Sequence, residues 1–286
     1  MQLAIAAGDY RLVAAPARGG SILSFTWRGE PVMREAEGPD ILDVGCFVMV
    51  PFANRIKDGR FVWRGRPMII PPNLEGRDRL NPIHGYGWQA EWAVVETAPE
   101  RLRFGHRHAG EGWPWPYRAD LAYALDTGGL TARLTLTNTG DEAMPAGLGF
   151  HPYFPRSATT RYIGLHRGEW QTGRDPLPVA LERRTTAIDW WEGSPVGTRE
   201  VDTVYSGREG PLEILWPERA MALTITPSPA LALTAVYAPA GTGWFCAEPM
   251  NHLTDAVNGR DPAAAMPALE PGETAVVEMH LGVRPL

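Results

Sequence analysis

Hydrophobic and polar residues alternate with a period of two along several short stretches of the chain. Leu130 to Thr137 alternates leucine or alanine with threonine or arginine, and Arg101 to His108 follows the same pattern. Such alternation is typical of a β-strand that buries one face. Met221 to Thr226, Leu231 to Tyr237 and Thr274 to Val283 are further strand candidates. The pattern predicts a chain built mainly of strands.

Glycine-containing turn sequences separate these stretches, and helix signals are scarce. Trp27–Glu30, Trp63–Arg66 and Asp126–Gly129 are each expected to join two strands. The helix candidates are short, covering Thr185 to Trp191 and Asp255 to Asn258. These spacings predict an all-β fold, a large antiparallel β-sandwich.

Length and composition favour one large globular domain. A chain of 286 residues allows one all-β domain or two smaller ones. Its 27 prolines and 31 glycines are spread along the chain, with no linker, low-complexity tract or fixed-period repeat. We therefore expect a single domain over residues 1–286, with 44% hydrophobic residues supplying a sizeable core.

Charge and cysteine content exclude several classes of function. A formal charge of −6 without a dense basic run argues against nucleic-acid binding. The first ten residues do not resemble a secretory signal, and no apolar stretch is as long as a membrane span. We expect a cytoplasmic protein that is a monomer or a homodimer. Cys46 and Cys246 make neither a disulfide framework nor a zinc set, and we expect reduced, buried thiols.

The segment Gly149-Phe150-His151-Pro152-Tyr153-Phe154 is the most informative motif. Proline removes a backbone donor and biases the preceding residue towards an extended conformation, so His151 is expected to be held rigidly. Histidine titrates near neutral pH, which suits a rigidly held ring to proton transfer. The alternative is a histidine that only hydrogen-bonds within an aromatic corner.

Two earlier segments carry groups suited to a hydroxyl-rich ligand. Asn54 and Arg55 offer amide and guanidinium donors, although they also fit a surface turn closed by Gly59. His84 lies among glycines that allow close approach of the backbone to a ligand, and Trp88 nearby is a possible stacking face.

Glu248 is the candidate general base. It follows the apolar run Trp244 to Ala247, so burial is expected to raise its pKa. A buried carboxylate paired with an arginine is the structural alternative. Two histidines and a carboxylate, without a nucleophile elbow or phosphate loop, suggest proton transfer on a neutral substrate.

The remaining histidines have weaker contexts. His106 and His108 share one face of a strand, but no third metal ligand is apparent, and we expect both to be solvated. His166, His252 and His280 are expected to have packing or surface roles. We therefore predict no metal site.

The order of these motifs resembles the aldose 1-epimerase (galactose mutarotase) family. The matching segments are Asn54-Arg55-Ile56, His84-Gly85, His151-Pro152-Tyr153-Phe154, Asp202 within Val201-Asp202-Thr203, and Glu248-Pro249. They appear in the family's order and with similar spacing, and the resemblance covers nearly the whole chain.

The resemblance implies the galactose mutarotase supersandwich and interconversion of α and β anomers of a free monosaccharide without a cofactor. It implies that Glu248 is the base for the C1 hydroxyl and that His151 is the acid for the ring oxygen. His84 would assist near that oxygen, while Arg55 and Asp202 would hold other hydroxyls. Ring opening needs an acid and a base whose pKa values are shifted towards each other.

Two departures from the family pattern leave the preferred sugar open. Tyr86 stands where the family often has a second glycine, and Ala235, ahead of Tyr237, stands where many members have glutamine. A hexose-6-phosphate mutarotase is one alternative, because Arg77 or Arg79 could bind a phosphate. A non-catalytic sugar-binding protein on the same scaffold is another.

Overall fold

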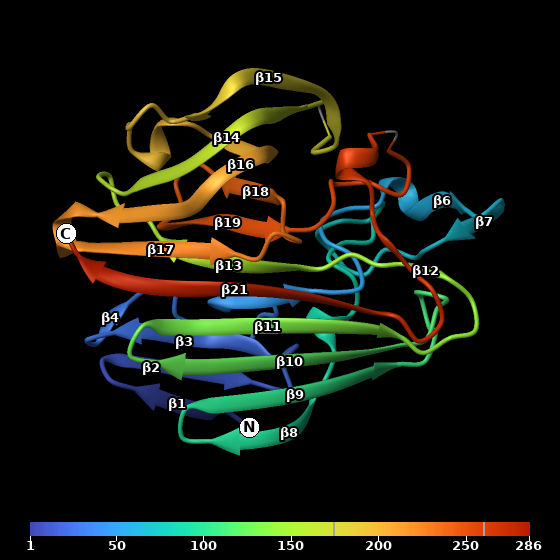
Figure 1. Cartoon of the computed structure of the whole chain (residues 1–286), viewed down its shortest axis with the longest axis horizontal. Coiled ribbons are helices and arrows are strands. Elements are labelled where there is room, and N and C mark those ends of the chain that lie inside the picture. The colour runs from blue at the N-terminus through green and yellow to red at the C-terminus, as the bar shows by residue number, and fades with distance from the viewer. Residues whose placement is uncertain (174, 260) are drawn as a thin grey trace.

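The computed structural model describes residues 1–173, 175–259 and 261–286, and its regular structure consists almost entirely of β-strands (Figure 1). The strands are β1 (Leu3–Ala7), β2 (Tyr10–Ala15), β3 (Ser21–Trp27), β4 (Glu30–Pro31), β5 (Cys46–Met49), β6 (Arg60–Trp63), β7 (Arg66–Ile69), β8 (Ala93–Ala98), β9 (Arg101–His108), β10 (Tyr117–Asp126), β11 (Gly129–Asn138), β12 (Met144–Pro145), β13 (Gly149–Pro155), β14 (Arg161–Thr172), β15 (Pro178–Asp189), β16 (Val201–Trp216), β17 (Met221–Pro227), β18 (Leu233–Ala238), β19 (Trp244–Met250), β20 (Ala268–Leu269) and β21 (Thr274–Pro285). Short 3-10 turns are η1 (Lys57–Gly59), η2 (Gly87–Gln89), η3 (Val196–Thr198), η4 (Pro217–Arg219) and η5 (Pro262–Ala264).

Seventeen of these strands belong to one continuous sheet whose strand pairs are all antiparallel. Figure 1 shows β14 to β19 in one half of the molecule and β1 to β3 with β8 to β11 in the other. Strand β21 joins the halves, since it pairs with β11 on one side and β17 on the other. The predicted antiparallel sandwich is therefore confirmed.

The alternating stretches form strands as predicted. Residues Arg101–His108 form β9, and the stretch beginning at Leu130 lies within β11 (Gly129–Asn138). In β11 the alternate residues Leu130, Ala132 and Leu134 are buried, because successive side chains of a strand point to opposite faces. The three predicted turns each connect two neighbouring strands.

Both predicted helices are wrong. Thr185 to Asp189 continues strand β15, which ends at Asp189, and the chain then turns at Trp190 and Trp191. Arg183, Thr185 and Ile188 lie in a strand that pairs with β14, so sheet hydrogen bonding overrides the local helix preference. Asp255 to Asn258 forms consecutive turns rather than a helix.

The expectations for the thiols and for two histidines have different outcomes. Cys46 and Cys246 are free and buried, as predicted. His106 and His108 are half-buried rather than solvated, because His108 stacks on Tyr117 with ring centroids 4.7 Å apart. Burial, with the nearby His108, lowers the pKa of His106 to about 4. Among the described residues, no helix is long and apolar enough to cross a membrane.

Gly85 fixes the approach of the segment 81–88 to strand β5. It has a φ of +70°, and its backbone forms an isolated bridge with Val50. A Cβ atom at this position would lie 2.1 Å from the carbonyl oxygen of Val50. Only glycine fits, because both the backbone conformation and the backbone contact exclude a side chain.

We expect Gly85→Ala to lower the free energy of unfolding by about 3 kcal/mol, because it adds a steric clash to the strain of a positive φ. Gly65→Ala is the matched control, since Gly65 has a φ of +83° but no atom within 4 Å of the added carbon. The control is expected to cost about 1 kcal/mol. Equal losses for the two variants in urea denaturation would contradict the predicted clash.

Candidate active site

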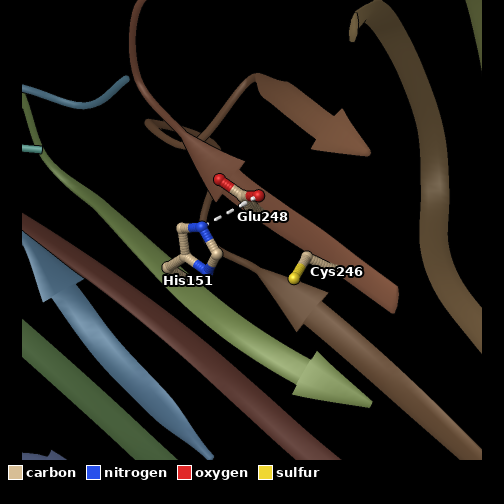
Figure 2. A group of neighbouring side chains, drawn as sticks. All are labelled: His151, Cys246 and Glu248. Carbon is tan, nitrogen blue, oxygen red and sulfur yellow. Dashed lines mark ion pairs between the residues drawn. The ribbon is translucent and has the colours of Figure 1, made fainter. Parts of the chain in front are cut away.

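Neighbouring strands bring His151 and Glu248 face to face. Strand β13 pairs with β19 so that Gly149 lies opposite Met250 and Tyr153 opposite Cys246. The same register between these pairs places His151 opposite Glu248. Side chains at opposite positions of an antiparallel pair share one face of the sheet. His151 Nε2 and Glu248 Oε1 are accordingly 3.3 Å apart, with both side chains more than nine-tenths buried (Figure 2).

Aromatic rings hold the His151 imidazole in place. Phe47 of β5 lies directly beside it in the sheet and stacks on it, with centroids 4.3 Å apart. Tyr153 lies 4.8 Å away on the same strand, and His84 contacts the ring edge-on at 5.0 Å. The imidazole is thereby fixed beside the carboxylate, consistent with the rigidity predicted from the flanking proline and aromatic residues.

Burial shifts the pKa values of the pair in opposite directions. Burial, together with the charges of Arg34 and Arg55, lowers the pKa of His151 to about 3. Burial and the neighbouring Asp202 raise the pKa of Glu248 well above its usual value, while Arg55 opposes that rise. Between the lowered pKa of His151 and the raised pKa of Glu248 the pair therefore carries a single proton, and the two shifts favour placing it on Glu248.

Two buried polar atoms of the pair have no hydrogen-bond partner among the described residues. They are Glu248 Oε2 and His151 Nδ1. Buried carboxylate oxygens are normally paired, so Glu248 Oε2 is available to accept a hydrogen bond from a bound ligand.

Cys246 lies beside the pair and completes a group of possible metal ligands. Figure 2 shows it on the strand that carries Glu248, and one ligand atom from each of the three side chains lies within 4.8 Å of the others. Nitrogen, sulfur and oxygen donors together suit Zn²⁺. Burial raises the pKa of the Cys246 thiol well above its usual value, so zinc would have to displace its proton. The pair His151–Glu248 can act on protons without any metal.

A reciprocal contact fixes the tautomer of His84. The backbone N–H of Asn54 donates to His84 Nδ1 at 3.2 Å, and the backbone N–H of His84 donates to the backbone carbonyl oxygen of Asn54 at 3.0 Å. Burial, followed by the charges of His151 and Arg55, lowers the pKa of His84 well below its usual value. The neutral ring must then carry its proton on Nε2, which makes this nitrogen a hydrogen-bond donor.

Arg55 is held between two carboxylates. Its Nε donates to Asp78 Oδ2 at 3.0 Å, and its Nη1 lies 3.8 Å from Asp202 Oδ2. Burial alone would raise the pKa of Asp78, but hydrogen bonds from Asn81, Leu80 and Arg55 hold it below its usual value. Asp78 therefore remains ionised and orients the guanidinium.

These groups surround a cavity of about 520 Å³. Six of the seven predicted site residues line it, namely Asn54, Arg55, His84, His151, Asp202 and Glu248. The first three come from two loops, whereas His151, Asp202 and Glu248 project from strands β13, β16 and β19. Residues far apart in the sequence are thus brought to one concave site of a size suited to a small molecule.

Trp88, the seventh residue, does not line the cavity. It is fully buried and stacks on Phe47, and its indole nitrogen donates to the Gly85 carbonyl oxygen at 3.0 Å. The predicted role as a stacking face for a ligand does not fit this position. The 3-10 turn η2 (Gly87–Gln89) directs the Trp88 indole inwards, where it supports the Phe47 ring that packs on His151.

Sequence reasoning missed several residues of the cavity wall. The aromatic part consists of Tyr153, Tyr237 and Trp244, and Arg34 lies over the Tyr153 ring at 3.9 Å. Alternation along β18 and β19 could have placed Tyr237 on the same face as Glu248. No local signal distinguishes Arg34 or Asp78 from other charged loop residues.

The positions that depart from the family pattern are not part of the cavity wall. Neither Tyr86 nor Ala235 is among its lining residues. Ala235 lies directly opposite Glu248 in the sheet, so it contributes a small side chain beneath the site. Of the two arginines considered for a phosphate, Arg77 lines the cavity and Arg79 does not.

Comparison with known proteins identifies the family of the chain. The family model for aldose 1-epimerase matches residues 1–282. The chain belongs to the aldose 1-epimerase family. The Escherichia coli K12 protein YphB, which is uncharacterized, is 32% identical over 276 residues, covering 93% of each protein.

Solved structures of similar proteins share the fold over the whole length. A candidate aldose 1-epimerase from Escherichia coli K12 has a TM-score of 0.90 at 29% identity, with 100% of this chain and 99% of that chain covered. A galactose mutarotase-like protein from Clostridium acetobutylicum has a TM-score of 0.88 at 18% identity, with coverage of 99% and 95%. The supersandwich expected for an aldose 1-epimerase family member is therefore confirmed.

Proposed function

We propose that the protein is an aldose 1-epimerase that interconverts the α and β anomers of a free aldose. The observation that carries this proposal is the buried His151–Glu248 pair, whose nitrogen and oxygen are 3.3 Å apart at the wall of the cavity. Anomer interconversion requires a base at the C1 hydroxyl and an acid at the ring oxygen, two atoms bonded to the same carbon. A closely spaced acid and base match that requirement.

The proposed reaction needs only proton transfers between the sugar and the two side chains, His151 and Glu248. In the reactive form of the pair its single proton lies on His151. Glu248, as the carboxylate, takes the proton of the C1 hydroxyl while protonated His151 gives a proton to the ring oxygen. The C1–O5 bond breaks, C1 becomes the aldehyde carbon, and the pair is left as a protonated Glu248 and a neutral His151. Rotation about C1–C2 exposes the other face of the aldehyde, and reversal of both transfers closes the ring as the other anomer.

The other cavity residues position the sugar. His84 donates from Nε2 near the ring oxygen, and Arg55 with Asp202 and Asn54 holds hydroxyls further from C1. The aromatic residues of the wall offer a face for the apolar side of the ring. Orientation between fixed groups supplies much of the advantage over catalysis by water.

A sugar phosphate is the second candidate substrate because Arg77 lines the cavity. The Arg77 guanidinium already pairs with Asp40, so a phosphate would have to compete with a carboxylate. Three aspartates and three arginines line the cavity beside Glu248, so its wall has no excess of positive charge to favour an anionic sugar.

We expect Glu248→Gln and His151→Asn each to lower the acceleration of mutarotation by about a hundredfold or more, because each removes one of the two proton-transfer groups. Polarimetry of freshly dissolved α-anomers, across free and phosphorylated sugars, measures this loss. Glu209→Gln and His280→Asn are matched controls outside the cavity and are expected to retain full activity.

The polarimetry results distinguish the proposed mechanism from a sugar phosphate substrate and from a binding protein. Activity that survives Glu248→Gln would refute the assigned mechanism, and acceleration confined to phosphorylated sugars would favour the sugar phosphate. No acceleration of any sugar would favour a binding protein.

The activity is expected to depend on pH through the single proton that the pair shares. On acidification His151 takes up a second proton at about pH 3, rather than near 6.5 as an exposed histidine would, and the base is then lost. On alkalinisation Glu248 loses the last proton only above its ordinary range, and the acid is then lost. We therefore expect kcat/KM to show no acid limb from His151 near pH 6.5.

An acid limb centred near pH 6.5 would contradict this electrostatic description. Circular dichroism at each pH separates loss of activity from unfolding. This control is needed because burial also lowers the pKa of His166 and of His252 to about 4, so that acidification destabilises the fold.

A further inference from the structure

The main chain at His84 has a conformation that residues with a side chain rarely adopt. His84 has a φ of +58°, and Gly85, which follows it, has a φ of +70°. A positive φ is strained for a residue other than glycine, so it persists only where neighbouring contacts impose it. His84 lines the catalytic cavity, and its backbone conformation sets the direction of its ring. The contacts that impose this conformation therefore decide where His84 Nε2 points.

The side chain of Asn73 binds the peptide groups on both sides of His84. Its Nδ2 donates to the carbonyl oxygen of Ile83 at 2.9 Å and to that of Gly85 at 2.7 Å. Its Oδ1 accepts from the backbone N–H of Ile83 at 2.7 Å. Gln89 Nε2 in turn donates to the Asn73 carbonyl oxygen at 2.7 Å, so Asn73 is itself held. One side-chain amide thus uses its donor and acceptor sides together to fix the chain before and after His84.

Trp88 donates to the same two carbonyl oxygens. Its Nε1 lies 3.0 Å from the oxygen of Gly85 and 3.3 Å from that of Ile83. Each of these oxygens therefore accepts from both Trp88 and Asn73, which a carbonyl with two lone pairs can do. We call Asn73 and Trp88 together the His84 clamp. The clamp explains why Trp88 is directed inwards rather than into the cavity.

Asn73 stands at one end of a short turn whose other end supports Arg55. Asp78 accepts from Arg55 Nε at 3.0 Å, and the backbone N–H of Asp78 donates to the Leu74 carbonyl oxygen at 3.1 Å, which closes the turn. Leu74 lines the cavity, whereas Asn73 is not among its lining residues. Asn73 can therefore affect a bound sugar only through the residues that it holds in place.

We propose that Asn73 is the positioning residue for His84 and that, with Trp88, it holds His84 Nε2 towards the ring oxygen of the bound sugar. The effect on reaction rate rests on the proposed aldose 1-epimerase function, whereas the effect on His84 itself does not. Without the Asn73 side chain, the N–H of the buried residue Ile83 loses its acceptor, and the strained peptide relaxes. The His84 ring then turns from the ring oxygen, while the acid–base pair stays in place on the sheet.

The first test compares Asn73→Ala with Asn138→Ala, a control that removes the same kind of hydrogen bonds elsewhere. Asn138 Nδ2 donates to the carbonyl oxygens of Glu142 and Leu269, and its Oδ1 accepts from the N–H of Gly140. None of these residues lines the cavity. Both variants are expected to lose stability in urea denaturation.

Only Asn73→Ala is expected to slow mutarotation of the free sugar that the wild-type protein converts fastest. We expect kcat to fall about tenfold and KM to stay within about twofold, because a donor at the ring oxygen acts mainly as that oxygen takes up negative charge. Equal kcat losses in Asn73→Ala and Asn138→Ala would overturn the inference.

A near-isosteric variant tests the clamp without creating a cavity. Asn73→Asp keeps the shape of the side chain and the acceptor for the N–H of Ile83, but it has no donor for the carbonyl oxygens of Ile83 and Gly85. It is expected to lower kcat as much as Asn73→Ala, and it carries the test if the alanine variant does not fold. Wild-type kcat in Asn73→Asp would overturn the inference.

A double-mutant cycle separates positioning of His84 from a general structural effect. In His84→Ala the ring that Asn73 orients is absent, so adding Asn73→Ala is expected to change kcat by no more than about twofold. If Asn73→Ala lowers kcat by the same factor with and without the His84 ring, Asn73 does not act through His84 and the inference fails.

NMR of the His84 ring distinguishes failure of this inference from failure of the proposed function, because it needs no turnover. The nitrogen chemical shifts of an imidazole report which nitrogen carries the proton, and His84→Ala identifies the signals. We expect one tautomer in the wild-type protein, protonated on Nε2, and a mixture of both in Asn73→Ala, where the contact of Nδ1 with Asn54 is loosened. If no sugar is converted, that change would still support the clamp. An unchanged single tautomer in Asn73→Ala would overturn it.

Discussion

The register between strands β13 and β19 is the constraint on which the site depends. It places His151 opposite Glu248 on one face of the sheet, although 97 positions of sequence separate them. A slip by one residue would turn one of the two side chains to the other face and separate the pair. The stack of Phe47 on His151 and the tight contact of Gly85 with Val50 hold the neighbouring elements to that register.

Burial then determines how the pair behaves. Removed from water, the imidazole favours its neutral form and the carboxyl its protonated form, so the pair holds a single proton between the lowered pKa of His151 and the raised pKa of Glu248. The ion pair of Arg55 with Asp78 keeps a fixed positive charge near Glu248 that limits the rise of its pKa.

The sequence predicted the strands well and the site in large part, for physical reasons that differ between residues. Alternation of period two identified β9 and β11, because each buries only one face. Asn54, His84, His151 and Glu248 were found because unusual local sequence surrounds them. Trp88 was misplaced, since glycine neighbours indicate a turn but not the direction of its side chain. Arg34 and Asp78 gain their positions only through contacts between distant segments, which no local pattern encodes.

The most direct test of the paired mechanism is anomer exchange measured by NMR on an equilibrated sugar, with Glu248→Gln, His151→Asn and the double variant compared. Two groups that pass one proton between them act as a unit, so removing the second after the first costs little more. We expect the double variant to exchange anomers at about the rate of the slower single variant. Losses that multiply in the double variant would show that His151 and Glu248 act independently, and would contradict the shared-proton pair.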